Sequence, residues 1–308
     1  MVVGFDGESK CGKTTYIEAV KAEAEYQAQI LDDVLDPATG ILKHLNTNPP
    51  HPTVTYLDSL RFRNVTTVSA GNVFRAAAFY AIRSEHRGVP KPSFYPHDTD
   101  KLREMLNEDG ILDFLQDDPE VGSRVTPTAK LPGVQALCGA IFCDRVSQDY
   151  QADGGHNLVI IDARDPVATM GRNNLIGLDA DQIHPACVLP IYLDTPTDVA
   201  ASRMKGDYEA NLAIVTGRRH EDATRTELPV ARPTAFITDF TSWRRQFTVE
   251  ERRETVGLPY LRDNGERVSL GSIQYFAGLV AVAAQDQAYH LQQTQYSADE
   301  EALASSGH

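Results

Sequence analysis

The sequence predicts an α/β fold in which a central parallel β-sheet is covered by helices on both faces. Apolar, β-branched runs at residues 1–6, 64–68, 158–162 and 187–193 have the length of strands, and stretches of helical composition lie between them. Strands that alternate with helices in this way form parallel sheets. The run at 158–162, Leu-Val-Ile-Ile-Asp, is apolar up to its last residue, which is typical of a central strand buried on both faces.

The remaining elements follow from local spacing and composition. Apolar residues at helical spacing predict helices at residues 15–23, 73–82, 101–107, 131–146, 196–205 and 269–284. Short apolar runs predict two more strands, at 111–115 and 258–262. Residues 30–62 mix acidic residues with several prolines and are expected to form an irregular insertion. The tail at 286–308 is rich in Gln, Ser, Ala and Glu and is expected to be flexible.

Composition limits the possible partners. The 308 residues are enough for one elaborated domain, and no stretch has the composition of a long linker. With 43 acidic and 29 basic residues, the net charge of −14 argues against a nucleic-acid or anionic-membrane partner. Four cysteines without CxxC spacing suggest reduced thiols. We find neither a membrane-spanning run nor a signal peptide, so a cytoplasmic protein is expected.

Residues 7–14 read Gly-Glu-Ser-Lys-Cys-Gly-Lys-Thr, a complete G-x-x-x-x-G-K-T pattern between the first predicted strand and a helix. In such a loop the glycines let backbone N–H groups surround phosphate oxygens, and the helix presents its positive end to them. The lysine reaches the outer phosphates and the threonine hydroxyl binds Mg²⁺. The sequence therefore predicts a nucleoside triphosphate site formed by Gly7, Ser9, Gly12, Lys13, Thr14 and Thr15.

Two basic clusters stand out against the acidic background. Arg164 and Asp165 directly follow the most apolar strand, and Arg218, Asp222 and Arg225 are spaced to share one face of a helix. Phosphoryl transfer depends on positioning and charge stabilisation, so a kinase needs cations on the acceptor side as well as the donor side. A solvated helix face with an ion pair would give the same spacing.

The order of several short blocks resembles cytidylate kinase, a nucleoside monophosphate kinase of the P-loop class. The matching blocks occur at residues 4–14, 70–75, 122–126, 159–165, 191–194, 201–204, 218–225 and 232–233. They cover most of the chain outside 30–62 and 243–257. The resemblance implies a P-loop NTPase fold, a three-layer sandwich with one kinase domain over 1–308. It further implies an acceptor-binding insertion near 90–130 and a lid near 203–232.

The resemblance also implies roles for individual side chains. The loop would hold ATP, with Asp6 or Asp162 orienting Mg²⁺ through water, next to Thr14. Arg75 and Arg164 would bind the acceptor monophosphate, because a guanidinium fork matches phosphate oxygens. Base, sugar or acceptor phosphate would be bound by Asp165, Arg218, Asp222 and Arg225, with Arg124 at the end of the insertion. The residues closest to the transferred group would be Lys13, Arg164, Arg203 and Arg225.

The expected reaction is transfer of a phosphoryl group from Mg·ATP to a small-molecule acceptor, CMP or dCMP. The acceptor side departs from the family, because Ser69-Ala70-Gly71 lacks a usual carboxylate and hydroxyl and Pro166-Val167 replaces a glycine and aliphatic pattern. A modified pyrimidine nucleotide would suit a reshaped pocket equally well. Two alternatives remain: a kinase acting on another hydroxyl, including a base within DNA, and a nucleotide-binding switch protein. The oligomeric state is open.

Overall fold

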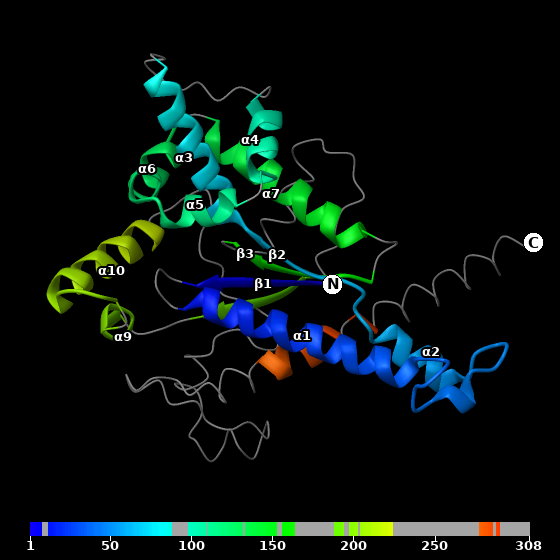
Figure 1. The fold of residues 1–308 in the computed structure, drawn as a ribbon. Coiled ribbons are helices and arrows are strands. Elements are labelled where there is room, and N and C mark those ends of the chain that lie inside the picture. Colours follow the sequence, from blue (N-terminus) through cyan, green and yellow to red (C-terminus); the bar gives the residue numbers. More distant parts are fainter. Residues whose placement is uncertain are drawn as a thin grey trace, which may run out of the picture.

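The computed structural model describes residues 1–7, 12–87, 98–108, 110–131, 133–152, 156–163, 188–193, 197–202, 204–223, 277–285 and 288–289. Within these ranges the chain has an α/β fold, with helices on both faces of a parallel sheet (Figure 1). The fold class expected from the alternating strands and helices is confirmed at this level.

The sheet has four described strands in the order β2-β3-β1-β4, and all neighbours are parallel. They are β1 (Val2–Gly7), β2 (Val65–Ser69), β3 (Leu158–Asp162) and β4 (Val188–Leu193). Each lies within a residue of its expected position, because apolar β-branched runs of this length have few alternatives. The predicted strand at 258–262 lies outside the described residues.

Alternating side chains divide the sheet into two apolar faces. Val3, Phe5 and Ile160 belong to a buried cluster with α1 (Lys13–Leu35) and helical residues 277–285. Val2, Val159 and Ile161 belong to the cluster on the other face, with α3 (Ala70–His86) and α7 (Val134–Gln151). The predicted helix at 269–284 is confirmed from 277 onward, and its earlier part lies outside the described residues.

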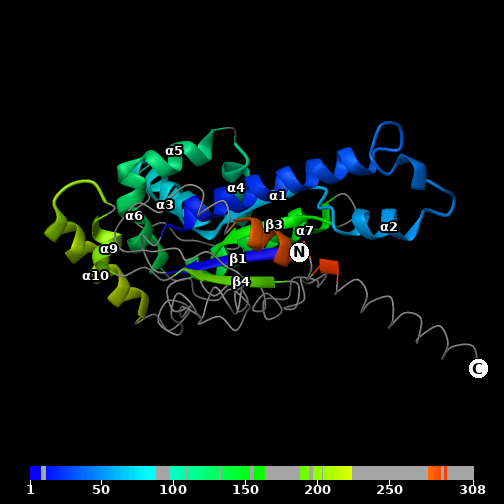
Figure 2. The same ribbon diagram turned by 90° about the horizontal axis from the view of Figure 1, so that it is seen from below.

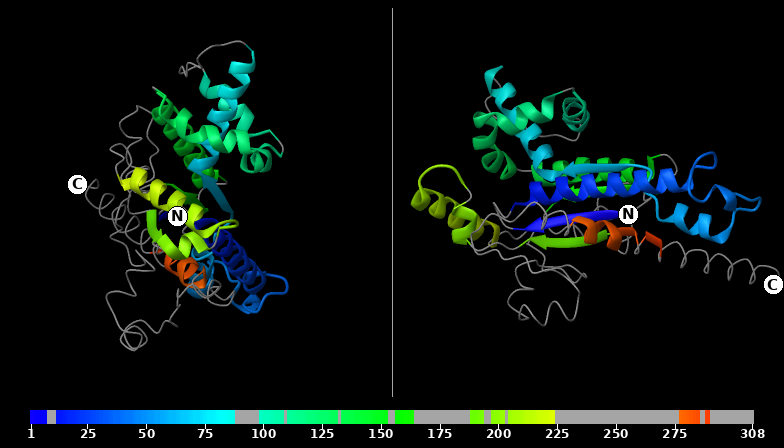
Figure 3. Two further views of the ribbon diagram at one scale, coloured as in Figure 1. Left: turned by 90° about the vertical axis from the view of Figure 1, so that its left-hand side faces the viewer. Right: turned by 60° about the horizontal axis from the view of Figure 1, so that its bottom comes forward.

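Helices α4 (Asp98–Leu106), α5 (Ile111–Asp117) and α6 (Pro119–Ala129) pack around α3 and stand away from the sheet (Figure 3). The predicted strand at 111–115 is wrong, because these residues form α5. Gly110 begins that helix with a left-handed φ of 73°. Ile111 and Leu115 are one helical turn apart and both buried. The run is so short that it fits helical and extended spacing equally well.

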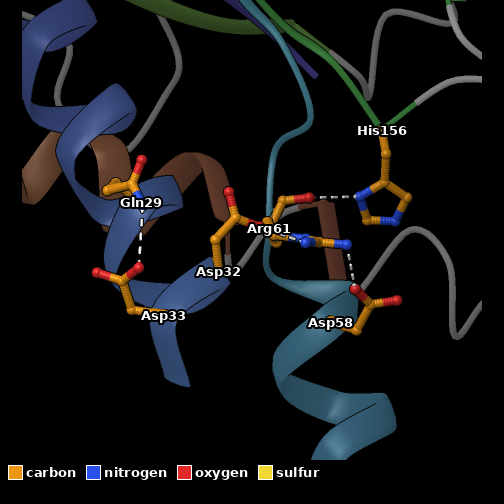
Figure 4. A network of polar contacts seen from close by, with 6 residues as sticks. All are labelled: Gln29, Asp32, Asp33, Asp58, Arg61 and His156. Carbon is orange, nitrogen blue, oxygen red and sulfur yellow. Dashed lines mark hydrogen bonds and ion pairs between the residues drawn. The ribbon is translucent and has the colours of Figure 1, made fainter. Parts of the chain in front are cut away.

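An arm extends beyond the amino-terminal end of the sheet, formed by the second half of α1, the 3₁₀ turn Lys43–Leu45 and α2 (Pro52–Ser59) (Figures 1 and 2). Residues 30–62 are therefore irregular only in the connections between these helices. Arg61 connects the two helices of the arm, because its guanidinium forms ion pairs with Asp32 of α1 and, at 2.7 Å, with Asp58 of α2 (Figure 4). The Arg61 carbonyl lies 3.0 Å from Nδ1 of His156, just before β3.

Helices α9 (Thr197–Ser202) and α10 (Tyr208–Ala223) pack on each other through Ala200, Ala201 and Val215. Cys138 and Cys143 lie on α7 and are both buried. Burial raises the pKa of the Cys138 thiol to about 12, so this thiol stays protonated at neutral pH. Among the helices in the described part of the chain, none combines the length and the apolar character needed to cross a membrane.

Asn157 connects the start of β3 to the end of α7. Its side-chain amide, on a residue only 1% exposed, donates to the carbonyls of Asp149, Tyr150 and Ala152 at 3.1, 3.2 and 2.5 Å. Its Oδ1 accepts from Asn64 at 3.1 Å. These contacts satisfy helix-end carbonyls that would otherwise be buried without partners.

We therefore expect Asn157→Ala to lower the free energy of unfolding by about 2–3 kcal/mol, because it leaves buried polar groups without partners. Urea unfolding followed by circular dichroism measures the change. Asn107→Ala, at an exposed position after α4, is the matched control and should stay within about 0.5 kcal/mol of the wild type. Equal effects of the two substitutions would contradict the role given to Asn157.

Candidate functional site

The G-x-x-x-x-G-K-T segment joins β1 to α1, as the motif requires. Strand β1 ends at Gly7 and α1 begins at Lys13, while residues 8–11, and with them Ser9, lie outside the described residues. Gly12 precedes the helix with a φ of 91°, a conformation that favours glycine. Its carbonyl accepts from the backbone N–H of Thr15 at 3.1 Å and starts the first turn. Thr14 and Thr15 are exposed on that turn.

The loop lies at the switch point of the sheet. Strands β1 and β3 are neighbours, but the chain continues from β1 to β2 on one side and from β3 to β4 on the other. The connections after these two strands therefore run in opposite directions across the sheet, and open parallel sheets bind ligands at such a switch point. The switch point could not be predicted from a sequence motif, because it depends on the order of the strands in the sheet.

Lys13 and Asp162 meet at this edge of the sheet. The ammonium Nζ lies 3.9 Å from Oδ1 of Asp162, and the two side chains are 17% and 30% exposed. Asp162 is the last residue of β3 and is in register with Phe5 of β1. A cation on the first turn of α1 and a carboxylate on the adjacent strand are thus side by side and still reached by solvent.

The two candidate Mg²⁺ carboxylates lie on different faces of the sheet. Asp162 continues the alternation of Leu158 and Ile160, which face α1, whereas Asp6 continues the alternation of Val2, which faces α3 and α7. Asp6 is buried, with 2% exposure. Of the two carboxylates, Asp162 is the one on the side of the loop lysine and the exposed Thr14.

Arg75 lies at the same edge of the sheet, at the start of α3. Ser69, the last residue of β2, is in register with Asp162. The Arg75 guanidinium folds back toward this strand end, where its Nη1 donates to Oδ1 of Asn72 at 3.2 Å. A Cβ added to Gly71 would lie 3.1 Å from Nη1 of Arg75 and 3.3 Å from the Ser69 hydroxyl oxygen. The absent glycine side chain thus lets the guanidinium lie close to the backbone. With strands about 4.8 Å apart, β2 and β1 are separated by about 10 Å.

Of the other predicted binding residues, some lie on helices α6 and α10, and the rest lie outside the described residues. Arg124 on α6 forms an ion pair with Glu85 in the last turn of α3, about 24 Å along that helix from Ser69. Arg218 is exposed on α10, and Asp222 lies in the same helix. The neighbouring Arg219 donates to the Thr197 hydroxyl of α9 at 2.8 Å. Outside the described residues are Arg164, Asp165, Arg203 and Arg225.

One set of side chains next to Arg75 is absent from the sequence-based prediction. Phe79 and Arg83 follow Arg75 at successive helical turns of α3, and Phe114 of α5 packs against Phe79. The spacing of the α3 residues could have indicated a shared face. Phe114 could not have been found, because the segment that carries it was assigned to a strand.

A scan against protein-family models and a search of curated proteins found no match to this chain. The functional interpretation therefore depends on the geometry of the described residues and on the motif that they carry.

Proposed function

We propose that this chain is an ATP-dependent kinase of the P-loop class that phosphorylates a pyrimidine nucleoside monophosphate. The observation that carries the proposal is the meeting of Lys13 and Asp162, 3.9 Å apart, at the switch point of the sheet. Lys13 completes a phosphate-binding motif and Asp162 ends the adjacent strand. A chance match to the motif would have no reason to fall at this position, or next to a carboxylate.

The donor site comprises the loop and the first turn of α1. Backbone N–H groups at the start of this helix have no partners within it, and the helix end carries a partial positive charge. Gly12 adopts the left-handed conformation that lets the loop enter the helix. Lys13 would exchange its contact with Asp162 for the outer phosphates of ATP. This exchange costs little, because both side chains remain partly solvated in the ion pair.

The residues present also suit Mg²⁺, which accompanies ATP. Magnesium prefers oxygen ligands and is usually held by one or two protein groups together with substrate phosphates and water. The hydroxyl of the exposed Thr14, which follows Lys13 in the chain, and the carboxylate of Asp162, which contacts Lys13, are both oxygen ligands. Bound there, the ion would supply positive charge next to the phosphates.

The acceptor site extends from Arg75. Arg75 begins the helix that follows β2, and β2 lies about 10 Å across the sheet edge from the strand that leads into the loop. From there its guanidinium can hold an acceptor monophosphate that faces the donor. An oxygen of that monophosphate attacks the terminal phosphorus of ATP, and the bond to the bridging oxygen breaks as ADP leaves. Lys13 and Arg75 neutralise charge on the donor and acceptor sides. The resemblance adds Arg164, Arg203 and Arg225 to this role.

The preference for a pyrimidine comes from the resemblance to cytidylate kinase, and CMP, dCMP or a modified pyrimidine nucleotide fits it. A panel of nucleoside monophosphates, incubated with Mg·ATP and followed by ADP formation, tests the proposal. We expect a pyrimidine monophosphate to raise ADP release at least about 10²-fold above the acceptor-free rate, because acceptor binding completes the site. A rate that no monophosphate changes would contradict the proposal and favour a nucleotide-binding switch.

A further inference from the structure

One face of α3 leads away from the sheet edge and carries charge and aromatic rings together. Arg75, Phe79 and Arg83 are spaced four residues apart, so their side chains share a face. Side chains on a helix lean toward its amino terminus. The Phe79 ring therefore leans toward the turn of Arg75, and the Arg75 guanidinium leans toward Gly71 and the sheet.

Phe114 of α5 extends this face into a two-ring surface, the Phe79–Phe114 platform. The ring centroids lie 5.3 Å apart at an interplanar angle of 65°, an edge-to-face contact. In Figure 1, α5 crosses α3 near the point where α3 leaves the sheet, and the two helices are in contact. Phe114 is 45% exposed, unusual for a phenylalanine held by a neighbouring ring.

Arg83 holds the platform from the side away from the sheet. Its guanidinium carbon lies 5.0 Å from the centroid of the Phe79 ring, within the range of a cation–π contact. Phe79 is thus fixed between Arg83 and Phe114, and Phe114 keeps the more accessible ring. An exposed ring held in one orientation is suited to stacking against a flat ligand.

The spacing along α3 fits a single nucleotide. Arg75 and Phe79 are one turn apart, about 6 Å along the helix axis, which is comparable to the span from a 5′-phosphate to its base. A phosphate bound by Arg75 would place its own base over the platform.

We propose that the Phe79–Phe114 platform stacks the base of the acceptor nucleotide, and that Phe114 is its main base-contacting residue. This inference rests on the proposed function and adds that the acceptor nucleotide is recognised partly through the flat face of its base. Stacking reads the flat face of a ring, so substituents on the ring edge would be tolerated there. The net charge of −14 favours a mononucleotide over a nucleic-acid strand.

Steady-state kinetics on Phe114→Ala, with CMP and ATP varied in turn, tests the platform. We expect the KM for CMP to rise about 10-fold, within the range for losing one base–aromatic stack, while the KM for ATP stays within about 2-fold. Ribose 5-phosphate, which lacks a base, is used as a competitive inhibitor, and its inhibition constant should not change. Phe114→Tyr keeps a ring and should restore the wild-type KM for CMP.

Tyr26→Ala is the matched control, because it removes another exposed ring, 63% accessible, on the distant arm. It should leave both KM values unchanged. The platform is overturned if Phe114→Ala behaves like the wild type, or if it weakens CMP and ribose 5-phosphate equally, which would indicate a structural effect on Arg75. Faster phosphoryl transfer to an oligonucleotide than to CMP would also overturn the proposed role of the platform. If the wild type itself transfers phosphate to no mononucleotide, the proposed function fails and the platform with it.

Discussion

Lys13→Ala should lower kcat for phosphoryl transfer by about 10³-fold, because it removes the cation that stabilises charge on the outer phosphates of ATP. The substitution leaves the fold intact, since Lys13 is partly exposed and its contact with Asp162 is a long ion pair at 3.9 Å. Acceptor-dependent ADP formation at saturating ATP and CMP measures the effect. The melting temperature should change little.

Lys21→Ala is the control for this substitution. Lys21 lies on the same helix, is 41% exposed and pairs with Glu25 at 3.7 Å. Its removal should leave kcat unchanged. If Lys13→Ala lost less than about 10-fold in kcat, the loop would not be the donor site, since a single displaced charge stabiliser costs more than that.

Arg75→Ala is expected to act on the other substrate. It should raise the KM for the acceptor monophosphate by about 10- to 150-fold, because hydrogen bonds from a charged group to phosphate contribute about 1.5–3 kcal/mol. The KM for ATP should stay within about 2-fold. Arg75→Lys keeps the charge without the two-pronged geometry and should lie between the wild type and Arg75→Ala.

Arg87→Ala, at the exposed residue just beyond the end of α3, controls for the loss of a positive charge. Its acceptor KM should equal that of the wild type. A rise in the KM for ATP as large as the rise for the acceptor would contradict the assignment of Arg75 to the acceptor side. The Lys13 and Arg75 variants thus test the two halves of the site separately.

The sheet could be predicted because its strands are short, apolar runs with few alternatives. Leu158–Asp162 is a strand from first to last predicted residue, since four buried apolar residues followed by a carboxylate suit a central parallel strand. The same reasoning failed at Ile111–Asp117, where tertiary contacts with α3 and a left-handed Gly110 decide for a helix. The number of apolar residues does not distinguish these cases, because residues 111–115 and 158–162 each contain four apolar residues and one Asp.

The sequence identified several residues of the candidate site, but it did not predict which of them are in contact. The motif identified Lys13, and the strand end identified Asp162, but their contact depends on the order β2-β3-β1-β4. Strand order follows from how helices pack on the two faces, which no single segment encodes. Phe79 and Phe114 meet for the same reason, through the packing of α5 on α3. Arg124, by contrast, pairs with Glu85, a partner 39 positions away that spacing could not indicate.

The destination of the terminal phosphate of ATP tests the central claim most directly. ATP labelled in that phosphate is incubated with the protein, Mg²⁺ and CMP, and the products are separated by chromatography. A two-substrate site with Lys13 on the donor side and Arg75 on the acceptor side predicts that the label appears in the nucleoside diphosphate, with an equal amount of ADP. Label found only in inorganic phosphate, at a rate that CMP does not change, would contradict it.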